Sequence, residues 1–167
     1  LLMDEYKLEG GLDIQLDKRI PVAAGMAGGS TDAASCMLAL NDLYELGLSK
    51  RQLMKRGVRL GADIPYCILK GTALSEGIGE KISTIPKMPD CYVLICKPGI
   101  HVSTGFVYTN LVLDENTPHP DIDYMIACMK KKDLKTLCQN LGNVLETVTI
   151  PAHPEIAKIK ETMMQEG

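Results

Sequence analysis

Residues 18–35 constrain this chain more than any other stretch, because they join a strand-like segment to a glycine-rich loop and a helix start. The stretch is KRIPVAAGMAGGSTDAAS. The preceding residues 12–17, LDIQLD, alternate apolar and polar side chains, which predicts a half-buried strand. After the loop, apolar residues recur at helical spacing, and Gly47 is placed to end the helix. The sequence therefore predicts a strand, a loop and a helix that begins at Ser30, Thr31 and Asp32.

Such a junction suits a phosphate group. The first backbone N–H groups of a helix have no partner within it, and the helix dipole places about half a positive charge there. Gly25, Gly28 and Gly29 lack the Cβ atoms that would hold a polyphosphate away from the backbone. The hydroxyls of Ser30 and Thr31 add donors to phosphate oxygens or ligands for Mg²⁺. A simpler alternative is a capped helix on a tight turn.

Two common nucleotide-binding motifs do not match this loop. No lysine follows Gly28 or Gly29 as in a P-loop, and the spacing G-x-x-G-G is not that of a dinucleotide fingerprint. Instead, the stretch IPVAAGMAGGSTDAA resembles the second signature motif of the GHMP kinases. Within that family, its residues are most similar to those of the branch that phosphorylates a cytidine diphosphate-linked methylerythritol.

The resemblance implies that this loop binds ATP and that Ser30 helps to hold Mg²⁺. For Lys18 the residues alone leave a solvated charge at a strand end as an equal alternative. The ATP-binding residues implied are Lys18, Pro21, Val22, Ala23, Ala24, Gly25, Met26, Ala27, Gly28, Gly29, Ser30 and Thr31.

A second motif, GADIPY at residues 61–66, contains the candidate catalytic base, Asp63. A turn locked by proline can hold a carboxylate in one orientation, although an aspartate that only caps the turn is the alternative from the residues alone. The motif resembles the G-A-D-[IV]-P-[FY] of the family, which implies that Asp63 accepts the proton of the substrate hydroxyl. Residues 71–80 are also similar to the hairpin that follows in the family.

Residues 97–108 resemble the segment of the family that contacts the cytidine end of the substrate. The resemblance implies that Thr104 hydrogen-bonds there and that Tyr108 supplies an aromatic face for the cytosine ring. The alternative for Tyr108 is an ordinary core aromatic. Residues 140–146 are similar to a segment of the family's C-terminal domain, where we expect a packing role.

Composition excludes several classes of protein. The formal net charge of −3 argues against nucleic acid as a partner. The six cysteines include no C-x-x-C pair and none of the three histidines lies at zinc-ligand spacing, so we expect free thiols in the cytoplasm rather than disulfides or zinc. No apolar run approaches the roughly 20 residues of a membrane span.

The order of the remaining patterns predicts a two-part α+β protein. We expect a helix from the Ser49 cap to about residue 60, a short strand at 67–69, a hairpin at 72–85 and a buried strand at 92–97. Helices are expected around 106–108 and at 122–129, 133–140 and 154–166.

The resemblance implies a GHMP-kinase fold, with a ribosomal protein S5 domain 2-like N-terminal part and an α/β C-terminal substrate domain. Residues 1–86 would belong to the nucleotide-binding domain and residues 87–167 to the substrate domain.

Both ends of the chain are expected to cut through that fold. The resemblance implies further N-terminal strands, with a hydroxyl-polarising lysine and an aromatic partner for cytosine, and a third glycine-rich motif beyond residue 167. Residues 1–167 alone are therefore expected to be inactive and to self-associate, with a homodimer as one form. Another GHMP kinase, of the homoserine or mevalonate type, and a nucleotide-binding fragment without catalysis are the alternative functions.

Overall fold

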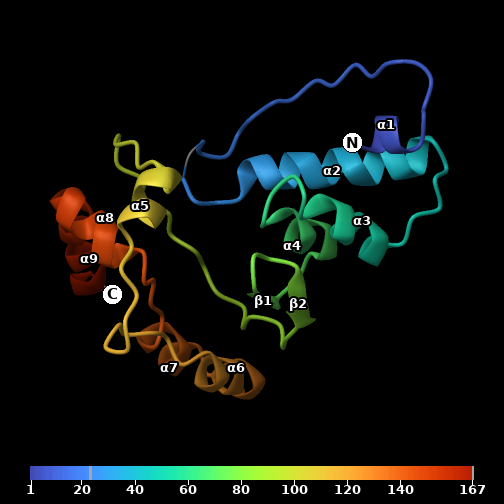
Figure 1. Cartoon of the computed structure of the whole chain (residues 1–167). Coiled ribbons are helices and arrows are strands. Elements are labelled where there is room, and N and C mark those ends of the chain that lie inside the picture. The colour runs from blue at the N-terminus through green and yellow to red at the C-terminus, as the bar shows by residue number, and fades with distance from the viewer. Residues whose placement is uncertain (23, 167) are drawn as a thin grey trace. The chain divides into compact units, whose positions relative to one another are not determined.

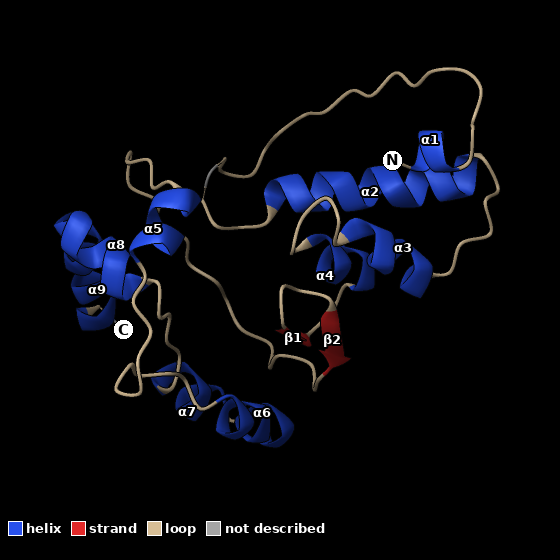
Figure 2. Cartoon of the chain, viewed as in Figure 1, coloured by secondary structure: helices blue, strands red, loops and turns tan. Residues whose placement is uncertain are grey.

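A computed structural model describes residues 1–22 and 24–166, which fall into two compact units, Leu1–Pro86 and Lys87–Gly167 (Figure 1). Most of the regular secondary structure in both units is helical, and the described strands lie in one hairpin (Figure 2). The elements of the first unit are α1 (Leu2–Glu5), α2 (Gly28–Leu43), α3 (Lys50–Gly57), α4 (Ile64–Leu69), β1 (Ala73–Glu76) and β2 (Lys81–Thr84). Those of the second are α5 (Thr104–Asn110), α6 (Ile122–Lys131), α7 (Leu134–Gln139), α8 (Glu146–Ala152) and α9 (Pro154–Gln165).

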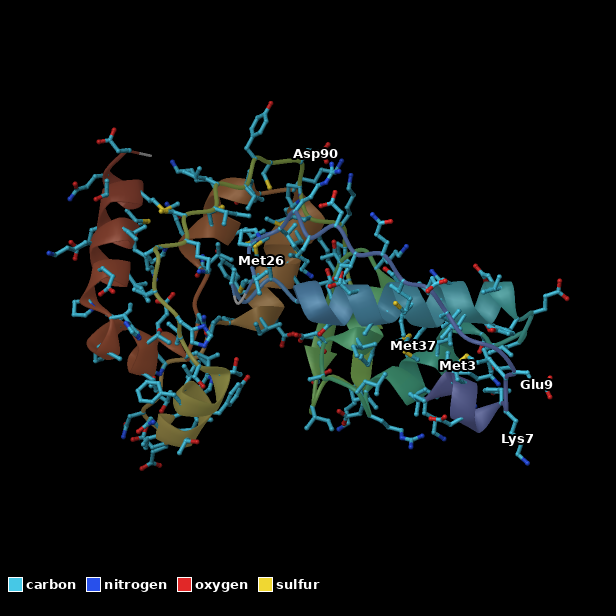
Figure 3. All side chains as sticks on the ribbon, turned by 90° about the horizontal axis from the view of Figure 1, so that it is seen from above. Met3, Lys7, Glu9, Met26, Met37 and Asp90 are labelled. Carbon is cyan, nitrogen blue, oxygen red and sulfur yellow. The ribbon has the colours of Figure 1, made fainter. Side chains whose placement is uncertain are left out.

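The core of the first unit lies where α2, α3 and α4 meet. Gly57 ends α3 and lets it approach α4 closely, since a Cβ on Gly57 would lie 2.6 Å from Ile64 Cγ2. Met37, labelled in Figure 3, belongs to the buried face of α2. The fully buried cluster consists of Leu2, Ala34, Met37, Leu53, Ile64 and Ile68.

The predicted cap of α3 is confirmed. The Ser49 hydroxyl accepts the N–H of Gln52 at 3.3 Å, and Gln52 Oε1 accepts the N–H of Ser49 at 2.9 Å, which is a capping box. The helix ends at Gly57, three residues before the predicted end, because the chain turns there and the N–H groups of Leu60 and Gly61 both bond to the Gly57 carbonyl.

The predicted hairpin is also confirmed. β1 and β2 pair antiparallel, with Ala73 opposite Thr84 and Glu76 opposite Lys81. The connecting turn uses Gly77 at φ +68° and Gly79 at φ +102°, values that favour glycine.

The prediction of a strand at residues 12–17 is wrong. These residues form an irregular segment that runs back along α2 (Figure 1), with the side chains of Ile14 and Leu16 65% and 59% exposed. A groove of about 580 Å³ separates the segment from α2. Alternation predicts which side chains share a face, but a strand also needs a neighbour to pair with, and in the described part of this unit only β1 and β2 pair.

The predicted strand at residues 67–69 is a helix, α4. Pro65 lies in its first turn, where a proline costs no hydrogen bond. Ile64 and Ile68 are four residues apart and both buried, so the segment buries one side of a helix.

In the second unit, the helices predicted around 106–108, 122–129, 133–140 and 154–166 are confirmed as α5, α6, α7 and α9. Ser103, Asp121 and Asp133 cap the first three by accepting the backbone N–H three residues later. Helix α8 was not predicted. The prediction of a buried strand at 92–97 is wrong, because these residues form no strand and the side chains of residues 92–95 are exposed.

The helices and the small antiparallel sheet together form an α+β arrangement, as the sequence predicts. Among the described residues, no helix has the length and apolar character that crossing a bilayer requires.

Candidate functional site

The glycine-rich loop of the first unit surrounds a hollow of about 270 Å³. Met26, labelled in Figure 3, lies on this loop just before α2. Ala23 lies outside the described residues, so its predicted contact with ATP stays a prediction. The lining residues all belong to the predicted nucleotide-binding set: Lys18, Pro21, Val22, Ala24, Gly25, Met26, Ala27, Gly28 and Gly29.

Helix α2 begins two residues earlier than predicted, at Gly28 rather than Ser30. Gly25 at φ +65° and Ala27 at φ +49° turn the chain into the helix. The first backbone bond of the helix joins the Thr31 N–H to the Ala27 carbonyl at 2.8 Å. The N–H groups of Gly28, Gly29 and Ser30 therefore precede the first intrahelical bond and form the positive end of the helix dipole.

Lys18 and Asp32 join the two ends of the loop through an ion pair between Lys18 Nζ and Asp32 Oδ2. Both side chains are half-buried. Gly28 makes room for the pair, since a Cβ there would lie 3.0 Å from Lys18 Nζ and 3.1 Å from Ile20 Cδ1. Lys18 is thus not a solvated charge at a strand end. The role of Asp32 was not predicted, because the loop separates it from Lys18 by fourteen residues.

The first turn of α2 packs against the segment that carries the second motif. Thr31 Oγ1 donates to the Ala27 carbonyl at 3.0 Å and lies 3.5 Å from Cys67 Sγ on α4. Ser30 Oγ would lie 3.9 Å from a Cβ on Gly61. The loop and the GADIPY motif are therefore neighbours within one compact unit.

Asp63 occupies the N-cap position of α4, and its side chain is exposed. Its carbonyl accepts the Cys67 N–H at 3.0 Å, but its carboxylate makes no capping hydrogen bond with α4. The alternative of a capping aspartate is therefore not supported, and the carboxylate is open to a ligand.

Thr104 and Tyr108 lie on α5, in the second unit. They are four residues apart, so they share a face of the helix, and both are exposed. Val107 is buried and anchors α5. Because the Tyr108 side chain is 62% exposed, it is not the ordinary core aromatic that was the alternative.

Acidic, histidine and cysteine side chains do not gather into a metal-binding group of three or more anywhere in residues 1–22 and 24–166.

Comparison with known proteins identifies relatives over the whole chain. Residues 1–71 match the family described as GHMP kinases N terminal domain. Proteins named 4-diphosphocytidyl-2-C-methyl-D-erythritol kinase from Lachnoclostridium phytofermentans and Lachnospira eligens are 54% and 52% identical to all 167 residues. The chain spans 57% and 58% of the length of these two relatives.

A solved structure of a kinase with the same activity in its name also matches this chain. The crystal structure of 4-(cytidine 5'-diphospho)-2C-methyl-D-erythritol kinase matches with a TM-score of 0.66 at 26% identity, over 89% of this chain and 53% of that one. The chain is thus similar to kinases along its whole sequence, and residues 1–71 match the N-terminal domain of the GHMP kinases.

Proposed function

We propose that the protein transfers the γ-phosphoryl group of ATP to the 2-hydroxyl of 4-diphosphocytidyl-2-C-methyl-D-erythritol, a step of isoprenoid biosynthesis. The relatives named for this kinase support the proposal along the whole chain. The observation that carries it is the packing of the first turn of α2, next to the loop hollow, against the segment that holds Asp63. This packing supports a phosphate site and a candidate base within one unit.

In this proposal the loop holds the triphosphate mainly through backbone groups. The N–H groups of Gly28, Gly29 and Ser30 donate to phosphate oxygens, and the absent Cβ atoms let the phosphate come close. Lys18 adds the positive charge of the lining and would divide its ammonium donors between Asp32 and a phosphate oxygen.

Mg²⁺ fits the donor groups of this loop. The ion prefers oxygen ligands and usually combines one or two protein oxygens with phosphate oxygens and water. Ser30 supplies a hydroxyl in the first turn of α2, so we propose that it is one of the ligands. Mg²⁺ would neutralise charge on the transferred phosphoryl group.

Asp63 is the proposed base, which accepts the proton of the attacking hydroxyl. A carboxylate is a weak base, so the contribution of Asp63 must come from its position more than from its basicity. The rest of catalysis would come from alignment and charge stabilisation, as in other phosphoryl transfers.

Thr104 and Tyr108 are the proposed contacts of the cytidine end. Their shared face on α5 combines a hydroxyl with an exposed aromatic ring, a pairing that suits a base with polar edges. In the same proposal residues 1–86 form part of the nucleotide-binding domain and residues 87–167 part of the substrate domain.

Two further properties belong to the proposal. The six thiols are unpaired in the described chain, which suits a reducing cytoplasm. The exposed Ile14 and Leu16 support self-association of residues 1–167 when no other chain covers them.

An acceptor panel tests the function. We expect ADP release at about 1 s⁻¹ or faster with 4-diphosphocytidyl-2-C-methyl-D-erythritol in a coupled assay of the full-length protein. Homoserine and mevalonate should give kcat/KM values lower by about 10⁴, because they leave the cytidine contacts unfilled. Higher efficiency with homoserine or mevalonate would assign another GHMP kinase activity, and ATP binding without ADP release would leave only a binding role.

A further inference from the structure

The turn of the β1–β2 hairpin, residues 77–80, presses on the backbone next to Asp63. Gly79 is buried at φ +102°, and a Cβ on it would lie 2.0 Å from the Ala62 carbonyl oxygen and 2.8 Å from the Ala62 carbonyl carbon. Real Cβ contacts essentially never fall below 3.0 Å. The atoms in the way belong to the backbone, so no side-chain rotation can relieve the contact. Ala62 immediately precedes Asp63.

The turn is held by its own hydrogen bonds as well as by the hairpin. The Gly79 N–H donates to the Glu76 carbonyl at 3.2 Å, and the Glu80 carboxylate accepts the Ile78 N–H at 2.7 Å. Backbone hydrogen bonds from Glu80 itself and from Ile78 lower the pKa of the Glu80 carboxyl, so Glu80 stays ionised and bonded at neutral pH. The hairpin therefore presents a firm surface to Ala62.

We propose that the hairpin turn is a positioning element for Asp63, with Gly79 as the residue that sets how closely the turn approaches Ala62. The inference rests on the proposed role of Asp63 as the base. Gly79 is a positioning residue and not a catalytic one, because it acts on Asp63 through the Ala62 peptide.

The expected effect follows from the geometry. A methyl group at residue 79 must move about 1 Å further from the Ala62 oxygen to reach the shortest real contact. A misplacement of about 1 Å at a reacting group costs about 10²-fold in rate. The proposed phosphate donors lie on the glycine-rich loop and the first turn of α2, not on the hairpin turn. The loss of rate should therefore fall on kcat rather than on the KM for ATP.

Gly71 provides a matched control for the experiment. It has φ +83° at the start of the same hairpin, but a Cβ there would have nothing within 4 Å. Gly79→Ala and Gly71→Ala therefore impose similar backbone strain, and only the first pushes on Ala62. In the full-length protein, Gly79→Ala should lower kcat by about 10²-fold with the KM for ATP unchanged within about twofold. Gly71→Ala should keep kcat within about threefold of wild type. Equal losses in the two variants would overturn the proposal.

A double-mutant cycle separates positioning of Asp63 from a general structural role. If Gly79 acts through Asp63, adding Gly79→Ala to Asp63→Asn should change kcat by no more than about twofold, because the group being positioned is already lost. A further 10²-fold loss in that background would overturn the inference. Failure of the proposed function is a separate result, in which Asp63→Asn by itself leaves kcat near wild type.

A second pair of variants applies if Gly79→Ala does not fold. Glu80→Ala removes the carboxylate that accepts the Ile78 N–H, whereas Glu76→Ala removes an exposed carboxylate from the same hairpin. Glu80→Ala should lower kcat by about tenfold, and Asp63→Asn should abolish that difference. A kcat equal to that of Glu76→Ala would count against the positioning role.

Discussion

Gly28 lies next to the Lys18 side chain of the ion pair with Asp32 and lines the proposed phosphate site. A side chain at this residue therefore has a defined consequence. A Cβ on Gly28 would already lie 3.0 Å from Lys18 Nζ and 3.1 Å from Ile20 Cδ1, so the methyl groups of a valine would crowd the same side. Gly28→Val should therefore displace the loop and weaken its donors to phosphate. We expect the KM for ATP to rise by about 10- to 100-fold, the worth of one or two charge-assisted hydrogen bonds.

The KM for the cytidine substrate should change by less than about twofold in the same variant, because its proposed contacts lie on α5. Gly11→Val is the matched control, since a Cβ on Gly11 has nothing within 4 Å. A rise of both constants in parallel would indicate general misfolding and would remove the support for the loop assignment.

At this scale the sequence predicts residues whose role is local and misses those whose role depends on a distant partner. The glycines of the loop and Ser49 are recognisable because their neighbours in sequence are their partners. The pairing of Lys18 with Asp32 and the contact of Gly79 with Ala62 join residues that are 14 and 17 apart, and nothing in their local pattern indicates the partner.

Among the elements, α3 offers a direct test of local stabilisation. Ser49→Ala removes the acceptor of the Gln52 N–H and should lower the free energy of unfolding by about 1 kcal/mol. The midpoint of urea unfolding measures the change. Ser49→Asp keeps an acceptor at the cap and should stay within a few tenths of a kcal/mol of wild type. Equal loss in both variants would contradict a capping role.

Each element that was predicted wrongly or missed has an identifiable physical cause. Residues 12–17 and 92–97 have apolar and β-branched patterns, but a strand exists only when a second strand pairs with it, and pairing is not encoded in a single segment. Residues 67–69 have the same kind of apolar run, yet Pro65 and the four-residue spacing of Ile64 and Ile68 favour a helix. Helix α8 was missed because Pro151 lies inside it.

At the scale of the whole molecule, the similarity to kinases depends on the whole length of the chain rather than on any one motif. The similarity to the named kinases extends over all 167 residues, from the glycine-rich loop through the GADIPY turn and the hairpin to α5 and beyond. Most of the candidate site was predictable from the sequence, because its motifs are contiguous. How the hairpin supports Asp63 needed the structure.

Replacement of Asp63 by asparagine tests the central claim most directly, because it keeps the shape of the side chain and removes its basicity. In the full-length protein, Asp63→Asn should lower kcat for phosphoryl transfer by about 10²–10⁴. Calorimetric titration should show an ATP dissociation constant within about twofold of wild type, because the nucleotide is proposed to bind to the loop. Asp42→Asn, which changes an exposed aspartate on α2, is the control and should match wild type in both measurements. A kcat for Asp63→Asn above about a tenth of wild type would contradict the account.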